Sequence, residues 1–255
     1  MRAVVLSALF AVLSTVTTVF ASDLEKEQRW ADQIVDSLLD GEAVYLNDGH
    51  SKFLAIETER VAGDAAKAVV VMHGTGVHPN WPTVVQPLRV GLTESGWHTL
   101  SIQMPVLANE AEHVAYAAIY DRVPGRIEAA VAHLRESGFD KIVLIAHSQG
   151  ATMTVYFLSR PHGPVDGFIA IGMSDGIAGG PMDTLAQLGA VETPILDLYG
   201  SEDLPEVLAS AAARKAAAAP GTDYSQYQVQ GADHFFDGEE GELLEAVNAW
   251  LDRHY

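Results

Sequence analysis

The 255-residue chain contains no cysteine. This excludes a disulfide framework, a thiolate metal site and a lipid-modified N-terminal cysteine, so stability must come from core packing. Basic residues are also scarce, because 15 Lys and Arg stand against 34 Asp and Glu, which gives a formal net charge of -19. Since these few basic residues form no cluster, nucleic acid and anionic membrane surfaces are poor candidate partners.

The one long hydrophobic run is N-terminal and extends from Ala3 to Phe20. Arg2 precedes it, and Val19-Phe20-Ala21 provides a small-residue cleavage site, so residues 1–21 are predicted to be a secretory signal peptide. An uncleaved anchor is the alternative, but the run contains several hydroxyl side chains and is at the short limit for spanning a membrane. We expect a secreted, periplasmic protein that begins near Ser22 and has no stable membrane anchor.

The remaining sequence, 22–255, predicts a single α/β domain, because it shows neither a linker nor an internal repeat. Strands are expected at 43–46, 52–57, 66–72, 97–103, 141–146, 167–173, 194–199 and 224–229. Helices are expected at 24–39, 82–94, 110–136, 149–158, 205–218 and 239–253. This alternation predicts a doubly wound, mainly parallel sheet with helices on both faces.

The most informative motif follows the apolar run 141–146. There, Ala146-His-Ser-Gln-Gly150 places Ser148 between two small residues, directly before a predicted helix. In the G-x-S-x-G motif, a sharp turn between strand and helix lifts a nucleophilic serine above the sheet. Alanine replaces the first glycine here and keeps the requirement for a small residue. The alternative is a serine that only caps the next helix.

From about Lys67 to the C-terminus, the chain resembles the α/β-hydrolase superfamily. The stretch His73-Gly-Thr-Gly-Val-His-Pro-Asn-Trp-Pro82, with Gly96-Trp97 and Gln103-Met-Pro105, is similar to a bacterial family of secreted hydrolase-like proteins without an assigned function. The superfamily's chain order of serine, acid and histidine implies Ser148, Asp203 and His234. The resemblance also implies that the backbone NH groups of Thr75 and Gln149 form the oxyanion hole.

Each assignment has a competing interpretation. Asp203 follows the glycine that ends strand 194–199, but Glu202, Asp197 or Asp175 could supply the acid instead. His234, in the loop after the last strand, could be a buried structural histidine. Two other histidines are expected to be structural: His73 would support the oxyanion loop, and His147 would point away from the substrate.

Trp81 and Phe235 are candidate substrate-binding residues, although Trp81 is equally consistent with packing at a helix start. Between strands 167–173 and 194–199 lie only about twenty residues, which predicts a minimal lid or none and an open site. No cofactor is expected. A metal site is not expected either, because His73, His78 and Asp48 or His50 lack a recognised ligand spacing.

These features together predict a carboxylesterase-like serine hydrolase that cleaves an ester-like acyl bond through an acyl-enzyme. Its expected partner is a small-molecule ester or an acyl group on a polymer. Two alternatives stay open. The first is a non-catalytic periplasmic binding or envelope-interaction protein on the same fold. The second is a peptidase or perhydrolase that uses the same triad.

Overall fold

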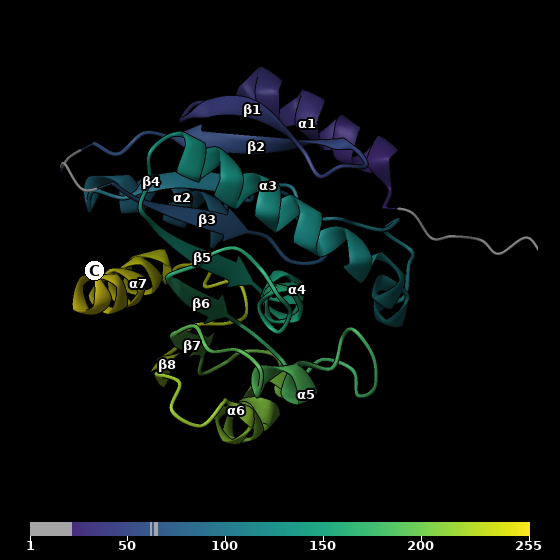
Figure 1. Cartoon of the computed structure of the whole chain (residues 1–255), viewed down its shortest axis with the longest axis vertical. Helices are drawn as coiled ribbons and strands as arrows, with labels where there is room; N and C mark the ends of the chain where they lie inside the picture. Colours follow the sequence, from purple (N-terminus) through teal and green to yellow (C-terminus); the bar gives the residue numbers. More distant parts are fainter. Residues whose placement is uncertain (1–21, 62, 64–65) are drawn as a thin grey trace, which may run out of the picture.

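A single sheet of eight strands organises the protein, whose computed structural model describes residues 22–61, 63 and 66–255 (Figure 1). The strand order is β1-β2-β4-β3-β5-β6-β7-β8. The strands are β1 (Glu42–Asn47), β2 (Lys52–Thr58), β3 (Lys67–Met72), β4 (His98–Ile102), β5 (Lys141–His147), β6 (Gly167–Ile171), β7 (Ile195–Gly200) and β8 (Tyr224–Val229). Only the β1–β2 and β2–β4 pairs are antiparallel, which confirms the predicted mainly parallel sheet.

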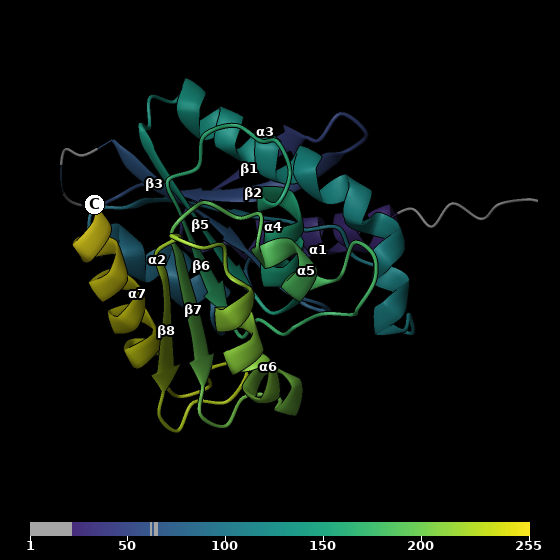
Figure 2. The ribbon, with the colours of Figure 1, turned by 60° about the horizontal axis from the view of Figure 1, so that its bottom comes forward.

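Helices cover both faces of this sheet. They are α1 (Leu24–Ser37), α2 (Val85–Glu94), the 3-10 helix η1 (His113–Arg122), α3 (Val123–Glu136), α4 (Gln149–Leu158), α5 (Thr184–Leu188), α6 (Pro205–Ala217) and α7 (Glu240–His254). One face packs against η1, α3, α4 and α5, with α6 beside α5. The other face packs against α1, α2 and α7. Figure 2 shows β7 and β8 side by side, with α7 and α6 on opposite sides of them.

The central strands are apolar on both faces because both faces are covered. Along β3, Val70 and Met72 join the core under α3 and α4, whereas Val69 and Val71 join the core under α2 and α7. A strand that is buried on both faces has a continuous apolar sequence, and this explains why β3 was predicted correctly from the sequence.

The strands β3 to β8 are all parallel, so their carboxyl ends lie at the same edge of the sheet. The loops after β3, β5, β7 and β8 therefore meet there, and they carry His73, Ser148, Asp203 and His234. In open α/β sheets this carboxyl edge is the usual place for a ligand site. The fold thus brings together residues from four distant parts of the sequence.

Three elements differ from the sequence prediction. The expected helix at 110–136 is two segments, since η1 ends at Arg122 and α3 begins beside Pro124, a residue that favours the first turn of a helix. Helix α2 begins at Val85 rather than at residue 82, because Val84 has a φ of 55° and cannot continue a right-handed helix. The short helix α5 was not expected.

Two findings bear on the predicted N-terminal segment. The proposed signal peptide, 1–21, lies outside the described residues. Within the part of the chain that the structure describes, no helix combines the length and the apolar character needed to cross a membrane.

Candidate active site

Ser148 forms a sharp turn between β5 and α4. Its backbone has a φ of 55° and a ψ of -124°, a conformation that is strained for a residue with a side chain. The surroundings hold it there: the Ser148 amide donates to the carbonyl of Ile171 at 2.8 Å. The Ser148 side chain makes no capping hydrogen bond to α4, so the helix-cap alternative does not describe this serine.

Glycines allow the neighbouring chain segments to approach this turn. A Cβ atom on Gly150 would lie 2.4 Å from the carbonyl oxygen of His73, and a Cβ atom on Gly74 would lie 2.8 Å from the Cβ of Ser148. Real Cβ atoms do not approach so closely. The loop after β3 can therefore lie directly against Ser148 only because both positions are glycine.

The Ser148, His234 and Asp203 side chains form one hydrogen-bonded chain. His234 Nε2 lies 2.9 Å from Ser148 Oγ, and His234 Nδ1 lies 2.6 Å from Asp203 Oδ1. Because a carboxylate only accepts, the proton of the neutral imidazole is on Nδ1, and Nε2 is free to accept from the serine hydroxyl. The structure thus brings together the three residues that the sequence predicted as a triad, in the geometry of a nucleophile, a base and an orienting acid.

Asp203 is buried yet remains a carboxylate. Burial alone would raise its pKa, but the hydrogen bond and charge of His234 and two backbone donors outweigh this effect and lower the pKa below its usual value. The amide of Leu204 donates to Oδ1 at 2.7 Å, and the amide of Gly200 lies 3.3 Å from Oδ2. The negative charge next to the His234 ring is therefore maintained at neutral pH.

The alternative acids lie elsewhere. Asp197 is fully buried, but it pairs with Arg214 at 2.9 Å and accepts from the hydroxyl of Tyr224 at 2.7 Å. Glu202 is exposed, and Asp175 is half-buried after β6. Among the described residues, Asp203 is the only carboxylate that bonds to the His234 ring.

His147 supports the loop that carries His234. Its Nε2–H donates to the backbone carbonyl of His234 at 2.8 Å, and the two ring centroids are 4.8 Å apart. Burial, followed by the proximity of His234, lowers the pKa of His147 to about 4, so this ring stays neutral at pH 7. As expected, His147 does not bond to Ser148 or Asp203 in the described structure and acts as a structural residue.

A cavity of about 310 Å³ opens beside Ser148 and His234. Thr75 and Gln149, the predicted oxyanion residues, both line it. Across residues 22–61, 63 and 66–255, neither backbone N–H donates a hydrogen bond within the chain. Gln149 is also the first residue of α4, where unpaired N–H groups and the helix dipole favour negative charge. The two amide N–H groups can therefore donate hydrogen bonds to a charged oxygen in this cavity.

Several lining residues were not predicted from the sequence. His113 comes from η1, and its Nε2 bonds to the side-chain oxygen of Gln149, while the Gln149 side-chain amide donates to Tyr120. Tyr120 in turn bonds to Thr152 at 2.8 Å. The expected absence of a large insertion between β6 and β7 agrees with the structure, but η1 still brings residues to the cavity from the segment before α3. The other lining residues are Gly172, Ser174, Leu204, Glu206 and Val207.

Trp81 and Phe235, the candidate substrate-binding residues, are not among the described residues that line this cavity. Trp81 is half-buried just before α2, where it packs against the core, and its ring centroid lies 5.3 Å from that of His78. Phe235 follows His234 and is 37% exposed, and the centroids of the two rings lie 5.3 Å apart in an edge-to-face arrangement.

His73, His78, Asp48 and His50 do not form a metal site in the structure. His73 is fully engaged by hydrogen bonds to Gly74, Gln103 and Met104. More generally, the described residues contain no group of three or more His, Asp or Glu side chains placed to hold a metal ion.

Solved structures with a similar fold include a dienelactone hydrolase and esterases. The chain superposes on Est1E from Butyrivibrio proteoclasticus with a TM-score of 0.68 and 14% identity, over 83% of this chain and 98% of that one. It superposes on a dienelactone hydrolase from Anabaena variabilis with a TM-score of 0.67 and 20% identity, over 84% and 97%. At these identities the likeness establishes the α/β-hydrolase fold.

Curated relatives match part of this chain. A putative protein-lysine deacylase of Homo sapiens, ABHD14B, is 28% identical over 145 residues, which cover 56% of this chain and 64% of the relative. Its Rattus norvegicus counterpart is 30% identical over 114 residues, 44% of this chain and 50% of the relative. The match therefore spans less than two thirds of these relatives. A family model described as "Protein of unknown function (DUF3530)" matches residues 17–121 and 108–253.

Proposed function

Given that the chain belongs to the DUF3530 family, whose description assigns no activity, we propose that it is a serine hydrolase that cleaves an ester-like acyl bond. The observation that carries this proposal is the unbroken chain of hydrogen bonds from Ser148 through His234 to Asp203, at 2.9 and 2.6 Å. The unpaired amides of Thr75 and Gln149 in the adjoining cavity support it.

In the proposed reaction, Ser148 Oγ attacks the acyl carbonyl carbon while His234 Nε2 takes the hydroxyl proton. The resulting imidazolium is stabilised by Asp203. The tetrahedral intermediate then collapses, the bond to the leaving alcohol breaks, and His234 returns the proton to that alcohol. Water repeats the same steps on the acyl-enzyme and releases the acid. Each oxyanion donor contributes roughly 3 to 4 kcal/mol to the barrier reduction.

The cavity suggests a substrate class. Its volume of about 310 Å³ suits a small acyl group, and no cap inserted after β6 encloses it. Glu206 is the only acidic residue among its described lining residues, and none of them is Lys or Arg. Together with the net charge of -19, this favours neutral substrates over anionic ones. We therefore propose a small soluble ester or an accessible acyl group on a polymer as the partner.

The proposed reaction uses only the side chains of the triad, two backbone N–H groups and water, and requires no cofactor. We further propose that the protein is secreted and resides in the periplasm. This follows from the signal-peptide pattern of residues 1–21 and not from the described residues.

The decisive experiment combines covalent labelling with turnover. The purified protein is incubated with a fluorophosphonate probe and, separately, with 4-nitrophenyl acetate, beside Ser148→Ala and the control Ser159→Ala. Ser159 lies at the other end of α4, half-buried and away from the cavity, which makes it a matched serine. The proposal predicts that Ser148→Ala loses both signals and that Ser159→Ala keeps both.

The other outcomes separate the alternatives. Labelling at Ser148 without ester turnover points to a peptidase or perhydrolase that uses the same triad. A folded wild-type protein that shows neither signal contradicts the proposal and favours the non-catalytic binding protein.

A further inference from the structure

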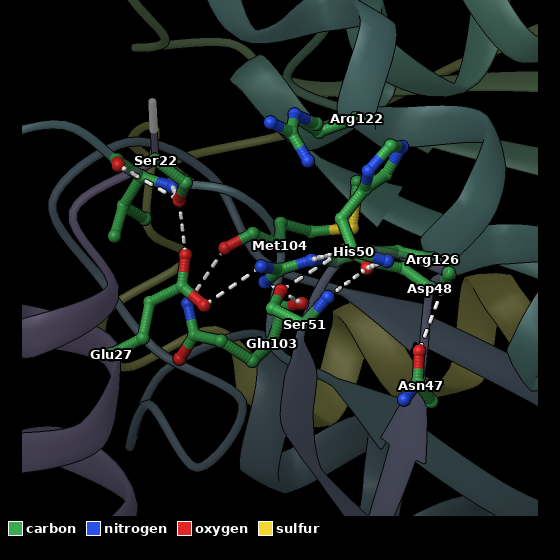
Figure 3. Close-up of polar contacts among 12 residues, drawn as sticks. Ser22, Glu27, Asn47, Asp48, His50, Ser51, Gln103, Met104, Arg122 and Arg126 are labelled. Atoms are coloured by element: carbon green, nitrogen blue, oxygen red, sulfur yellow. Dashed lines mark hydrogen bonds and ion pairs between the residues drawn. The ribbon is translucent and has the colours of Figure 1, made fainter. Parts of the chain in front are cut away.

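Arg126, on α3, is almost completely buried, and its guanidinium ties together three separate parts of the chain. Nη2 lies 2.8 Å from Oε2 of Glu27 on α1, an ion pair rather than a well-aligned hydrogen bond. Nε lies 3.3 Å from Oδ2 of Asp48 in the turn between β1 and β2. Figure 3 shows these carboxylates converging on Arg126. Two anionic partners thus fix the position of one cation in a buried environment.

The third contact of Arg126 points toward the proposed active site. Nη1 donates to the backbone carbonyl of Gln103 at 2.8 Å. Gln103 is itself buried, directly after β4, and its side-chain amide donates to His73 Nε2 at 2.9 Å and to the carbonyl of Met104 at 2.8 Å. Figure 3 includes Gln103, whose backbone carbonyl accepts the hydrogen bond from Arg126. The Arg126 guanidinium therefore positions Gln103, and Gln103 in turn positions the His73 ring.

These bonds fix the tautomer of His73. The backbone amide of Met104 lies 2.9 Å from His73 Nε2, and an amide N–H can only donate, so Nε2 carries no proton. The ring proton is then on Nδ1 and is donated to the carbonyl of Gly74 at 2.8 Å. Burial lowers the pKa of His73 to about 3, which keeps the ring in this neutral form.

The carbonyl of Gly74 and the N–H of Thr75 belong to the same peptide group. Because that group is planar and trans, the two bonds point in opposite directions, and fixing the carbonyl also fixes the direction of the N–H. This segment lies against the nucleophile, since a Cβ on Gly74 would lie 3.3 Å from Ser148 Oγ. His73 thereby sets the orientation of one of the two proposed oxyanion donors.

We propose that Arg126 is a positioning residue that acts through Gln103 and His73 to aim the Thr75 N–H at the oxyanion. In this role, Glu27 and Asp48 hold the guanidinium, so the docking of α1 and of the β1–β2 turn determines the geometry of the oxyanion hole. The catalytic consequence rests on the proposed serine hydrolase function, whereas the structural link to Thr75 does not.

The kinetic test uses Gln103→Met, Arg126→Lys and Glu27→Gln, with Arg214→Lys as the matched control. Arg214 is as buried as Arg126 and is also paired with a carboxylate, Asp197, but it makes no contact with the Thr75 loop in the described structure. The measurements are kcat and KM with 4-nitrophenyl acetate, the affinity for an alkylboronic acid that forms a tetrahedral adduct on Ser148, and the melting temperature.

The proposal predicts that kcat falls roughly 10- to 100-fold in Gln103→Met and Arg126→Lys, with KM changed less than about twofold, because only the transition state uses the donor. Boronate affinity falls in parallel. Glu27→Gln, the mildest variant, shows a smaller loss of the same kind. Arg214→Lys lowers the melting temperature without this selective loss of kcat. If the Arg126 and Gln103 variants keep kcat and boronate affinity, the proposal is overturned.

A second readout needs no activity. The backbone amide of Thr75 and the ring nitrogens of His73 are followed by NMR in the wild type and in the folded Glu27→Gln and Gln103→Met variants. The proposal predicts altered Thr75 amide shifts and a changed His73 Nδ1–H signal in both, but not in Arg214→Lys. Unchanged Thr75 and His73 signals refute it even if the wild type proves catalytically inert. If the wild type is catalytically inert but the variants alter the Thr75 and His73 signals, only the hydrolase function is rejected.

Discussion

The geometry around Asp203 predicts that Asn and Ala at this position have different effects. Oδ1 receives two donors, His234 Nδ1 at 2.6 Å and the Leu204 amide at 2.7 Å, whereas Oδ2 faces only the Gly200 amide at 3.3 Å. In Asp203→Asn, the amide oxygen should therefore occupy the Oδ1 position. There it still accepts from both donors and keeps the His234 proton on Nδ1.

The magnitude follows from the lost charge. Two unit charges about 4 Å apart interact by about 4 kcal/mol at an effective dielectric constant near 20, so removing the Asp203 charge should lower kcat roughly 10³-fold. Asp203→Ala loses the charge and also the group that orients the ring and selects its tautomer. We expect a decrease of roughly 10⁴-fold for this variant.

The assay measures kcat for 4-nitrophenyl acetate and the low-field Nδ1–H signal of His234 in both variants. The signal should persist in Asp203→Asn and disappear in Asp203→Ala. Equal losses of kcat and of the NMR signal in the two variants would refute the claim that backbone donors fix the Asn orientation. If kcat falls less than about tenfold in both variants, Asp203 is not the carboxylate that orients His234 for catalysis.

Three further predictions concern Gly172 beside His234, the buried His147 and the buried ion pair of Arg214 and Asp197. Gly172→Ala should lower kcat roughly 100-fold, because Gly172 has a φ of +59° and the new Cβ would lie 2.9 Å from His234 Cε1. The control Gly221→Ala, also at positive φ but with no neighbour within 4 Å, should keep the wild-type kcat. Equal kcat values in the two variants would contradict the reasoning. Burial lowers the pKa of His147 to about 4, so its contribution to stability is complete above the unfolded pKa of about 6.5 and is lost, by about 3 kcal/mol, as the pH falls toward 4. In urea unfolding between pH 7 and 4.5, the free energy of unfolding of His147→Gln should therefore depend less on pH than that of the wild type. An equal pH dependence in both proteins would argue against this role of His147. Arg214→Met should destabilise the protein by about 3 to 5 kcal/mol in urea unfolding, because the buried Asp197 carboxylate loses its cationic partner. The double variant with Asp197→Leu should recover much of this loss, and no recovery would contradict the reasoning.

Local sequence patterns predicted most of the fold correctly. The strands β3 and β5 are buried on both faces, so their apolar runs stand out without knowledge of their partners. The small residues around Ser148 reflect a steric requirement of one turn, which also acts locally. The helix at 110–136 was less well predicted, because apolar content alone does not separate a 3-10 segment from an α-helix.

The candidate site was predicted only in part. Residues that follow strand ends, such as Asp203 and His234, have a fixed place in the topology and could be found from their order. Trp81 could not be placed, because an aromatic ring at a helix start can pack into the core or face a cavity, and the available buried area decides which. His113 belongs to a segment that no local pattern connects to Ser148.

The sequence by itself predicted the doubly wound sheet, because apolar runs and their alternation are local patterns. It also led to the proposal of Ser148, Asp203 and His234, through the chain order of the superfamily that the chain resembles. Only the tertiary structure decided which side chains form the cavity and which support it. Arg126 shows the reason: its partners are the Glu27 and Asp48 carboxylates and the Gln103 carbonyl, which are distant in sequence. They meet only because the packing of α1, β1, β4 and α3 brings these polar groups into one buried volume.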